Sequence, residues 1–263
     1  MKESYLNRIL EKTAEEILEQ KLSSSLADMK SVIKDLPPSL PFIDTLLQKM
    51  VRGESAIIAE MKKASPSKGV IRKNFQPRVI AKSYENGGAD CLSILTNEPF
   101  FYGHLSHIGE VRSVVNLPIL RKDFIIDEFQ IYQSRQALAD CILLIVSALS
   151  LTQLEDYYAI AGELDLDVLL EVHDEIELEL ALNLEPKLIG VNNRDLRTFE
   201  VNLSTSIELN KKLQPNTFLI SESGINSAKD IALLKENKIF GYLIGEAFMR
   251  EDDPGSKIKE ILM

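Results

Sequence analysis

Two residues of opposite charge follow an apolar run early in the chain. Residues 56–59 have the composition of a buried strand, and Glu60 and Lys62 come directly after them. Because side chains two residues apart in a strand point to the same face, we expect this acid and this base to emerge side by side. The pair has two interpretations, proton transfer at a site or a simple ion pair at a strand end, and the spacing alone favours neither.

Polar residues also stand at the ends of later apolar runs. They occur in residues 120–124 (Leu-Arg-Lys-Asp-Phe), 170–173 (Leu-Glu-Val-His), 191–196 (Val-Asn-Asn-Arg-Asp-Leu), 220–224 (Ile-Ser-Glu-Ser-Gly) and 244–246 (Ile-Gly-Glu). One charge at such a place is usually a solvated loop residue. Polar groups at so many run ends indicate a functional site if the fold brings those ends together.

The elements that carry these residues repeat as a strand followed by a helix. Apolar β-type runs predict strands at residues 56–62, 91–96, 118–124, 141–146, 168–172, 188–192, 218–221 and 242–245. Helical patterns follow at residues 77–86, 105–115, 128–138, 151–161, 175–182, 203–213, 228–237 and 255–262. This alternation predicts parallel βαβ units and an α/β fold, the (β/α)8 TIM barrel, whose active site lies at the carboxyl ends of the strands. A doubly wound open sheet fits less well, because no Gly-x-Gly-x-x-Gly follows the first strand.

The segment before the first strand has a helical pattern and no strand of its own. Apolar residues recur at helical spacing from Tyr5 to Leu18, the serines at 23–25 interrupt the pattern, and prolines at 37, 38 and 41 stop a second helix. We expect one domain, residues 1–263. In it, residues 1–50 form a helical extension that covers the barrel mouth, and residues 56–263 form the barrel.

Composition excludes several classes of protein. The formal net charge is −10, from 40 acidic and 30 basic residues, which disfavours a nucleic-acid binder. No apolar run has the length of a membrane span. Cys91 and Cys141 lie in apolar segments and are expected to be reduced and buried, as in a cytoplasmic protein. His104 and His107 have the spacing of a helical metal pair, but no third ligand stands near them, so we expect no metal site.

Glycines at the ends of the last two predicted strands suggest a phosphate site. Ser223-Gly224 and Gly245-Glu246 form turns that lead towards helices. Barrels of this class often bind phosphate at this place, through backbone N–H groups and a helix N-terminus. We therefore expect a small phosphorylated partner molecule. Separately, we expect the protein to be a monomer.

Together these motifs resemble those of the indole-3-glycerol phosphate synthase family. The resemblance rests on residues 60–67 (Glu-Met-Lys-Lys-Ala-Ser-Pro-Ser), 120–124, 171–173, 192–196 and 222–225 (Glu-Ser-Gly-Ile), which occur in the family's order. It covers essentially the whole chain. It implies a (β/α)8 barrel of tryptophan biosynthesis that needs neither cofactor nor metal. The implied substrate is 1-(2-carboxyphenylamino)-1-deoxyribulose 5-phosphate, which undergoes ring closure and loses CO2 and then water.

The resemblance also implies roles for individual residues. Lys122 is the general acid of the condensation, Glu171 assists proton transfer, and Lys62 grips the substrate carboxylate and serves as an acid in the dehydration. Glu60, Asn192 and Ser223 orient the substrate and the two lysines. Further substrate or phosphate contacts are assigned to Ser65, Arg194, Glu222, Gly224, Gly245 and Glu246, and an apolar slot for the aromatic ring to Phe101, Phe124 and Leu143.

Two expectations concern the electrostatics of this site. A lysine that is partly desolvated and surrounded by other cations has a lowered pKa, which would suit it to acid–base catalysis near neutral pH. Glu246 stands where some relatives carry serine, and a carboxylate repels phosphate unless only its backbone N–H faces the ligand.

Two other functions fit the same residues. A sugar-phosphate isomerase or a Schiff-base aldolase could use Lys122 or Lys62, in the second case as the nucleophile that attacks a carbonyl. A non-catalytic barrel could bind a metabolite at the same mouth. Covalent trapping by borohydride with a ketose phosphate would favour the aldolase, and tight binding without turnover would favour the binder.

Overall fold

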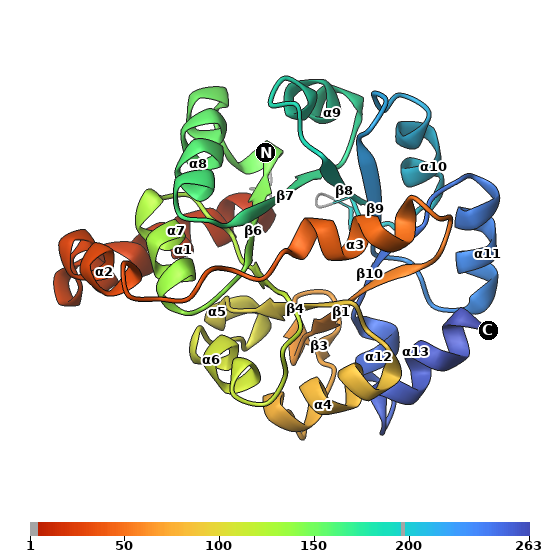
Figure 1. Cartoon of the computed structure of the whole chain (residues 1–263), viewed down its shortest axis with the longest axis horizontal. Coiled ribbons are helices and arrows are strands. Elements are labelled where there is room, and N and C mark those ends of the chain that lie inside the picture. Colours follow the sequence, from red (N-terminus) through yellow and green to blue (C-terminus); the bar gives the residue numbers. More distant parts are fainter. Residues whose placement is uncertain (1–4, 196–197) are drawn as a thin grey trace.

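The computed structural model describes residues 5–195 and 198–263, and the first four residues of the expected extension and Leu196 lie outside this range. Within it, eight parallel strands close into a barrel in the order β1-β10-β9-β8-β7-β6-β5-β4 (Figure 1). These strands are β1 (Ala56–Met61), β4 (Cys91–Leu95), β5 (Ile119–Lys122), β6 (Cys141–Ile145), β7 (Asp167–Val172), β8 (Leu188–Asn192), β9 (Phe218–Glu222) and β10 (Gly241–Ile244). The predicted (β/α)8 barrel is confirmed.

The helices that follow the strands form a ring around the barrel (Figure 1). They are α4 (Pro77–Gly87), α6 (Ser106–Arg112), α7 (Glu128–Gln136), α8 (Leu151–Glu163), α9 (Glu175–Leu182), α10 (Ser204–Asn210), α11 (Ala228–Glu236) and α13 (Pro254–Leu262). Their apolar faces cover the outward-facing residues of the strands, such as Ile57, Leu92 and Ile189, in one continuous core. Area removed from water on both faces of each strand is the main stabilisation of such a barrel.

The period of two along each strand decides what fills the barrel. On β1, Ile58 belongs to the apolar cluster inside the barrel, and Glu60, two residues further on, lines the cavity at the mouth. On β5, Leu120 likewise belongs to the apolar cluster inside the barrel, and Lys122 lines the cavity at the mouth. The interior is therefore apolar towards the amino ends of the strands and polar at their carboxyl ends.

The extension contacts both ends of the barrel. Helix α1 (Tyr5–Ser23) and α2 (Leu26–Ile33) lie beside α7, where Ile17 and Met29 pack against Phe129 and Tyr132 (Figure 1). Among the described residues of the extension, Tyr5, Leu6 and Ile9 in the first turns of α1 line the cavity at the mouth.

The third helix of the extension, α3 (Phe42–Met50), lies at the opposite end of the barrel. Phe42 and Leu46 are fully buried there in the cluster that includes Ala56 and Cys91, the first residues of β1 and β4. The start of α1 thus lies at the mouth, whereas α3 packs at the amino end, away from the mouth that the extension is expected to cover.

Several short elements carry no strong sequence pattern and were not predicted. A two-stranded hairpin, β2 (Ala64–Ser65) and β3 (Gly69–Val70), follows β1. Helix α5 (Glu98–Phe101) follows β4, the single turn η1 (Val146–Ala148) follows β6, and α12 (Glu246–Met249) follows β10. Elements of two to four residues are too short for hydrophobic periodicity to reveal.

Candidate active site

A cavity of about 540 Å³ opens at the carboxyl ends of the barrel strands. All the residues to which a site role was assigned from the sequence line it: Glu60, Lys62, Ser65, Phe101, Lys122, Phe124, Leu143, Glu171, Asn192, Arg194, Glu222, Ser223, Gly224, Gly245 and Glu246. The volume lies in the range typical of small-molecule sites. The period of two and the closure of the barrel together explain why residues so far apart in sequence share one cavity.

Lys122 lies between two buried carboxylates. Its Nζ donates hydrogen bonds to Glu171 and, at 2.8 Å, to Glu222 Oε2. The three residues come from β5, β7 and β9, and the two glutamate side chains are 3% and 2% exposed. Charges that are buried need such partners, because an unpaired charge away from water is costly.

The expectation of a lysine with a lowered pKa is wrong for Lys122. Burial lowers its pKa, but the fields of Glu171, Glu222 and Glu60 outweigh burial and hold the pKa well above its usual range. The neighbours of this lysine are carboxylates rather than cations. Lys122 is therefore a firmly protonated ammonium group in the unliganded protein.

The two carboxylates beside Lys122 differ in their pKa. Burial raises the pKa of Glu222, Lys122 only partly offsets it, and the pKa is about 7. Burial also acts on Glu171, but Lys122 and His173 outweigh it and the pKa of Glu171 lies well below its usual range. Two neighbouring acids with pKa values pushed apart are an arrangement suited to acid–base chemistry.

The pair seen first in the sequence forms as expected at the end of β1. Lys62 Nζ donates to Glu60 Oε1, and the side chains are 18% and 6% exposed. The hydroxyl of the buried Tyr84 donates to the backbone oxygen of Glu60 at 2.8 Å, which fixes the end of the strand. Gly245 leaves room for this carboxylate, because a Cβ at position 245 would overlap Glu60. The ion pair is thus held in the cavity rather than left in solvent.

Asn192 and Gly190 of β8 arrange the central carboxylates. Asn192 Nδ2 donates to Glu171 Oε1 at 3.2 Å. Gly190 was not singled out in the sequence, yet a Cβ there would overlap Glu222 Oε1. The signal that could have found it is its position two residues before Asn192, on the same face of a predicted strand.

A buried asparagine holds the turn after β9. Asn193 is 3% exposed and its Nδ2 donates to the backbone oxygens of Glu222, at 2.9 Å, and Ser223, at 3.1 Å. Ser223 and Gly224 have φ values of 65° and 84°, a left-handed conformation that is costly for serine and easy for glycine. Asn193, missed as a functional residue, keeps this turn facing the cavity.

Apolar side chains line one side of the cavity. The rings of Phe101 and Phe124 are 6.1 Å apart at an interplanar angle of 32°, and Leu143 lies at the same cavity. Phe101 comes from the unpredicted helix α5 and Phe124 from the loop after β5. The two faces and the leucine make an apolar slot of the kind a flat aromatic ring fills.

The Glu246 carboxylate is turned towards Arg250, the residue that follows α12. Its Oε1 accepts hydrogen bonds from Arg250 Nη2 at 2.7 Å and Nε at 3.2 Å. Burial raises the pKa of Glu246, but Arg250 and the more distant Lys62 and Lys68 outweigh burial and lower it. The negative charge next to Gly245 is therefore largely neutralised.

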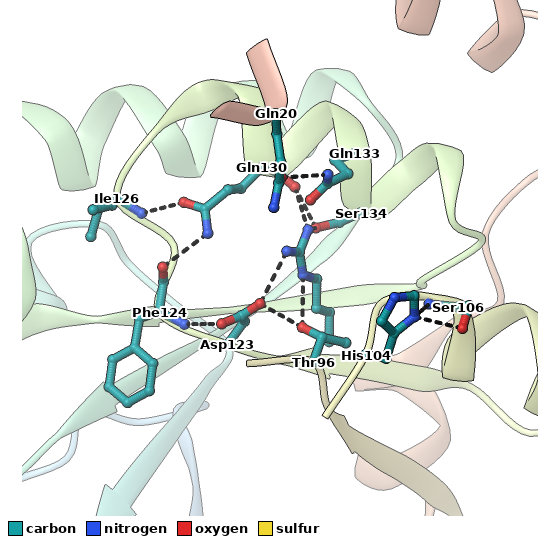
Figure 2. Close-up of polar contacts among 11 residues, drawn as sticks. Gln20, Thr96, His104, Ser106, Asp123, Phe124, Ile126, Gln130, Gln133 and Ser134 are labelled. Carbon is teal, nitrogen blue, oxygen red and sulfur yellow. Dashed lines mark hydrogen bonds and ion pairs between the residues drawn. The ribbon is translucent and has the colours of Figure 1, made fainter. Parts of the chain in front are cut away.

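A buried ion pair anchors the end of β5 and the loop after it, which carries Phe124 (Figure 2). The Arg121 guanidinium donates to Asp123 Oδ2 at 3.0 Å, to Thr96 Oγ1 at 3.1 Å and to Ser134 Oγ at 3.1 Å. Asp123 Oδ1 in turn accepts from the Phe124 backbone N–H at 2.9 Å. The network joins β4, β5 and α7, so it holds the carboxyl end of β5 in place.

The described residues contain no group of three or more His, Cys, Asp or Glu side chains that could hold a metal ion. In the same part of the chain, no helix is both long and apolar enough to cross a membrane.

The fold is a closed (β/α)8 barrel, and lysines paired with carboxylates lie at its mouth. These two features are typical of barrel enzymes whose active site lies at the carboxyl ends of the strands. The fold is similar to tryptophan synthase subunit alpha from Legionella pneumophila str. Paris (TM-score 0.62, 14% identity, 85% of this chain and 98% of that chain covered). It is also similar to KGPDC from Streptococcus mutans (TM-score 0.60, 11% identity, 79% and 95% covered). At such identities these likenesses concern the fold alone.

Sequence similarity defines the family. The family model of indole-3-glycerol phosphate synthase matches residues 6–261. Indole-3-glycerol phosphate synthase from Aromatoleum aromaticum (strain DSM 19018 / LMG 30748 / EbN1) is 43% identical over 256 residues, which cover 97% of this chain and 98% of that protein. The chain therefore belongs to the indole-3-glycerol phosphate synthase family, the carboxy-lyases of tryptophan biosynthesis, and the resemblance noted in the sequence is confirmed.

Proposed function

We propose that this mouth converts 1-(2-carboxyphenylamino)-1-deoxyribulose 5-phosphate to indole-3-glycerol phosphate, with Lys122 as the acid of ring closure. The observation that carries the assignment is the position of the Lys122 ammonium between Glu171 and Glu222. A protonated lysine can give a proton to the ribulose carbonyl as the ring carbon attacks it, and the carboxylates can return one. Glu171, which is ionised in the unliganded protein, is the carboxylate that accepts a proton.

The aromatic end of the substrate goes to the apolar slot of Phe101, Phe124 and Leu143. Lys62, directly after β1, binds the substrate carboxylate until that group leaves as CO2. Lys62 then donates the proton that lets the hydroxyl depart as water, and Glu60 holds it in place through their ion pair. Asn192 keeps Glu171 oriented through the 3.2 Å hydrogen bond.

The phosphate goes to the loops after β9 and β10. Gly224 and Gly245 offer backbone N–H groups without side chains in the way, and Ser65, Ser223 and Arg194 add polar contacts from the rim. Glu246 contributes its backbone only, because Arg250 holds its carboxylate.

A Schiff-base aldolase is the less favoured function. A Schiff-base lysine must be a free amine when the carbonyl arrives, whereas Lys122 is protonated in the unliganded protein, which is the state in which a general acid begins its reaction. A non-catalytic binder has no use for two lysines that are each paired with a buried glutamate. We further propose a cytoplasmic monomer in which the start of α1 shields the bound substrate from water.

The test is direct. The protein is incubated with the carboxyphenylamino-deoxyribulose phosphate, and the fluorescence of the indole product is followed, with the Lys122→Ala variant in parallel. Appearance of indole fluorescence in the parent protein alone supports the proposal. Tight binding of the substrate with no product in either protein would contradict it.

A further inference from the structure

His173, two residues beyond Glu171 at the end of β7, lies between two carboxylates. Its Nδ1 is 2.9 Å from Glu177 Oε2 on α9, and its Nε2 is 3.4 Å from Glu171 Oε1. The backbone N–H of His173 also donates to Glu177 Oε2, at 2.9 Å. The imidazole is 12% exposed, so the ring is held from two sides in a nearly dry position.

The acceptors on both sides define the protonation of the ring. An ionised carboxylate only accepts hydrogen bonds, so Nδ1 must carry a proton to bind Glu177. Nε2 faces Glu171, and a bare lone pair there would repel the carboxylate. Nε2 is buried and has no hydrogen bond within the described part of the chain, which leaves it directed at Glu171 alone among charged neighbours on that side. Both nitrogens are therefore protonated and the ring is a cation.

We propose that His173 is a positioning residue for the reaction, a cation fixed by Glu177 that keeps Glu171 ionised and its Oε2 turned towards Lys122. The inference rests on the role proposed above for Glu171 and adds the residues that support it. Glu171 Oε1 lies against His173 and Asn192, whereas Oε2 accepts from Lys122. The two oxygens of Glu171 thus contact different partners, and these contacts oppose rotation of the carboxylate.

The charges around the ring agree with this role. Burial lowers the pKa of His173, but Glu171 and Glu177 outweigh burial and raise it to about 10. The charged groups that face the ring are Glu171 from β7 and Glu177 from α9, with Lys122 and Glu222 behind Glu171. The 3.4 Å separation is long for a hydrogen bond, and contacts of this kind in unliganded sites often tighten when substrate binds.

Two substitutions of His173 distinguish the roles of its two ring nitrogens. His173→Asn keeps an amide near the position of Nδ1, within reach of Glu177, and loses the group that faces Glu171. His173→Gln places an amide near Nε2, so it restores a donor to Glu171 but not a charge. Glu177→Gln keeps the ring in place and removes one of the carboxylates that charge it.

The measurements are kcat and KM as functions of pH, with a thermal melt of each variant. We expect His173→Asn to lower kcat about 10- to 100-fold with little change in KM, the loss of one charge-assisted contact. Removal of a cation makes Glu171 easier to protonate, so the acidic limb of the kcat profile moves to higher pH. His173→Gln should recover part of kcat while its acidic limb stays displaced, and Glu177→Gln should displace the limb in the same direction.

The matched control is Glu175→Gln, two residues before Glu177 on α9, where the carboxylate is half exposed and pairs with Lys212. It should leave kcat and the pH profile as in the parent protein. An unchanged kcat and acidic limb in His173→Asn, or a lower kcat with an unchanged limb in all His173 variants, would overturn the inference.

A further variant distinguishes this failure from failure of the proposed function. If Glu171→Gln retains turnover, the role of Glu171 itself is wrong. If Glu171→Gln is inactive while His173→Asn behaves like the parent protein, only the inference about His173 is wrong.

Discussion

The ammonium group of Lys122 on β5 and the carboxylate of Glu222 on β9 are joined by a 2.8 Å hydrogen bond across the barrel mouth. The residues are 100 positions apart in the chain. Even with this cation in contact, burial holds the pKa of Glu222 near 7. Burial is the largest cause, and the negative charges of Glu171 and Glu60 add to it, so Lys122 offsets the rise only in part.

Lys122→Ala should have the largest catalytic effect of any single substitution at the site. Loss of a general acid typically lowers the reaction rate about 10²–10⁴-fold. We therefore expect kcat of Lys122→Ala to fall by at least about 10²-fold, with near-native substrate affinity. Lys62→Ala should raise KM as well, because it also loses the contact to the substrate carboxylate. Steady-state kinetics, with circular dichroism as the check on folding, decide the matter. The assignment of roles fails if the two kinetic signatures are exchanged.

Glu222→Gln should stabilise the protein more at high pH than at low pH. The folded-state pKa of about 7 lies above the ordinary value of 4.5, so Glu222 contributes stability below its unfolded-state pKa and loses it as the pH rises through 7. Glutamine carries no such penalty. The free energy of unfolding, measured by denaturant titration, should favour the variant at pH 8 and differ little from the parent at pH 5. An equal difference at both pH values would contradict the pKa.

Gly190→Ala should displace the Glu222 carboxylate and so lower both stability and activity. A methyl group at position 190 would overlap the Glu222 carboxylate, and overpacking of this kind costs about 1–3 kcal/mol of stability. Because Glu222 and Lys122 are bonded, kcat should fall too. The control is Gly162→Ala on α8, where nothing lies within 4 Å of the added group and alanine favours the helix. Equal kinetics in both variants would show that Glu222 yields without consequence.

Two truncations of the extension should distinguish the role of α1 and α2 from that of α3. Deletion of residues 1–40 removes α1 and α2, so we expect a folded barrel with raised KM or lowered kcat and a reduced Tm, because Phe129 and Tyr132 lose their cover. Deletion of residues 1–50 also removes α3 and the fully buried Phe42 and Leu46, and should prevent folding. Unchanged kinetics in the shorter truncation would remove the shielding role of α1.

Inorganic phosphate should inhibit competitively with the substrate. Arg250→Ala should weaken this inhibition, since it frees the Glu246 carboxylate to repel an anion at the neighbouring loop. Arg250→Lys, which keeps a cation within reach of Glu246, is the matched control and should resemble the parent. A stronger inhibition in Arg250→Ala would argue that Glu246 lies away from the phosphate.

The sequence by itself determined that the chain forms a barrel and which residues line the cavity at its mouth. Alternation along each strand put Glu60 and Lys122 on the same face as the apolar residues two before them, and strand–helix repetition required parallel strands. Those two local patterns suffice to bring the carboxyl ends together, which is why the predicted site residues share one cavity.

Only the tertiary structure decided which charges face one another. The pKa of Lys122 is raised rather than lowered because Glu171 and Glu222 reach it across the barrel, and no local pattern encodes that approach. The room that Gly190 leaves for Glu222, and the position of His173 between Glu171 and Glu177, likewise depend on neighbouring strands and helices. Helix α3 at the amino end of the barrel is the same case, because an amphipathic pattern shows that a helix buries one face but not which surface covers it.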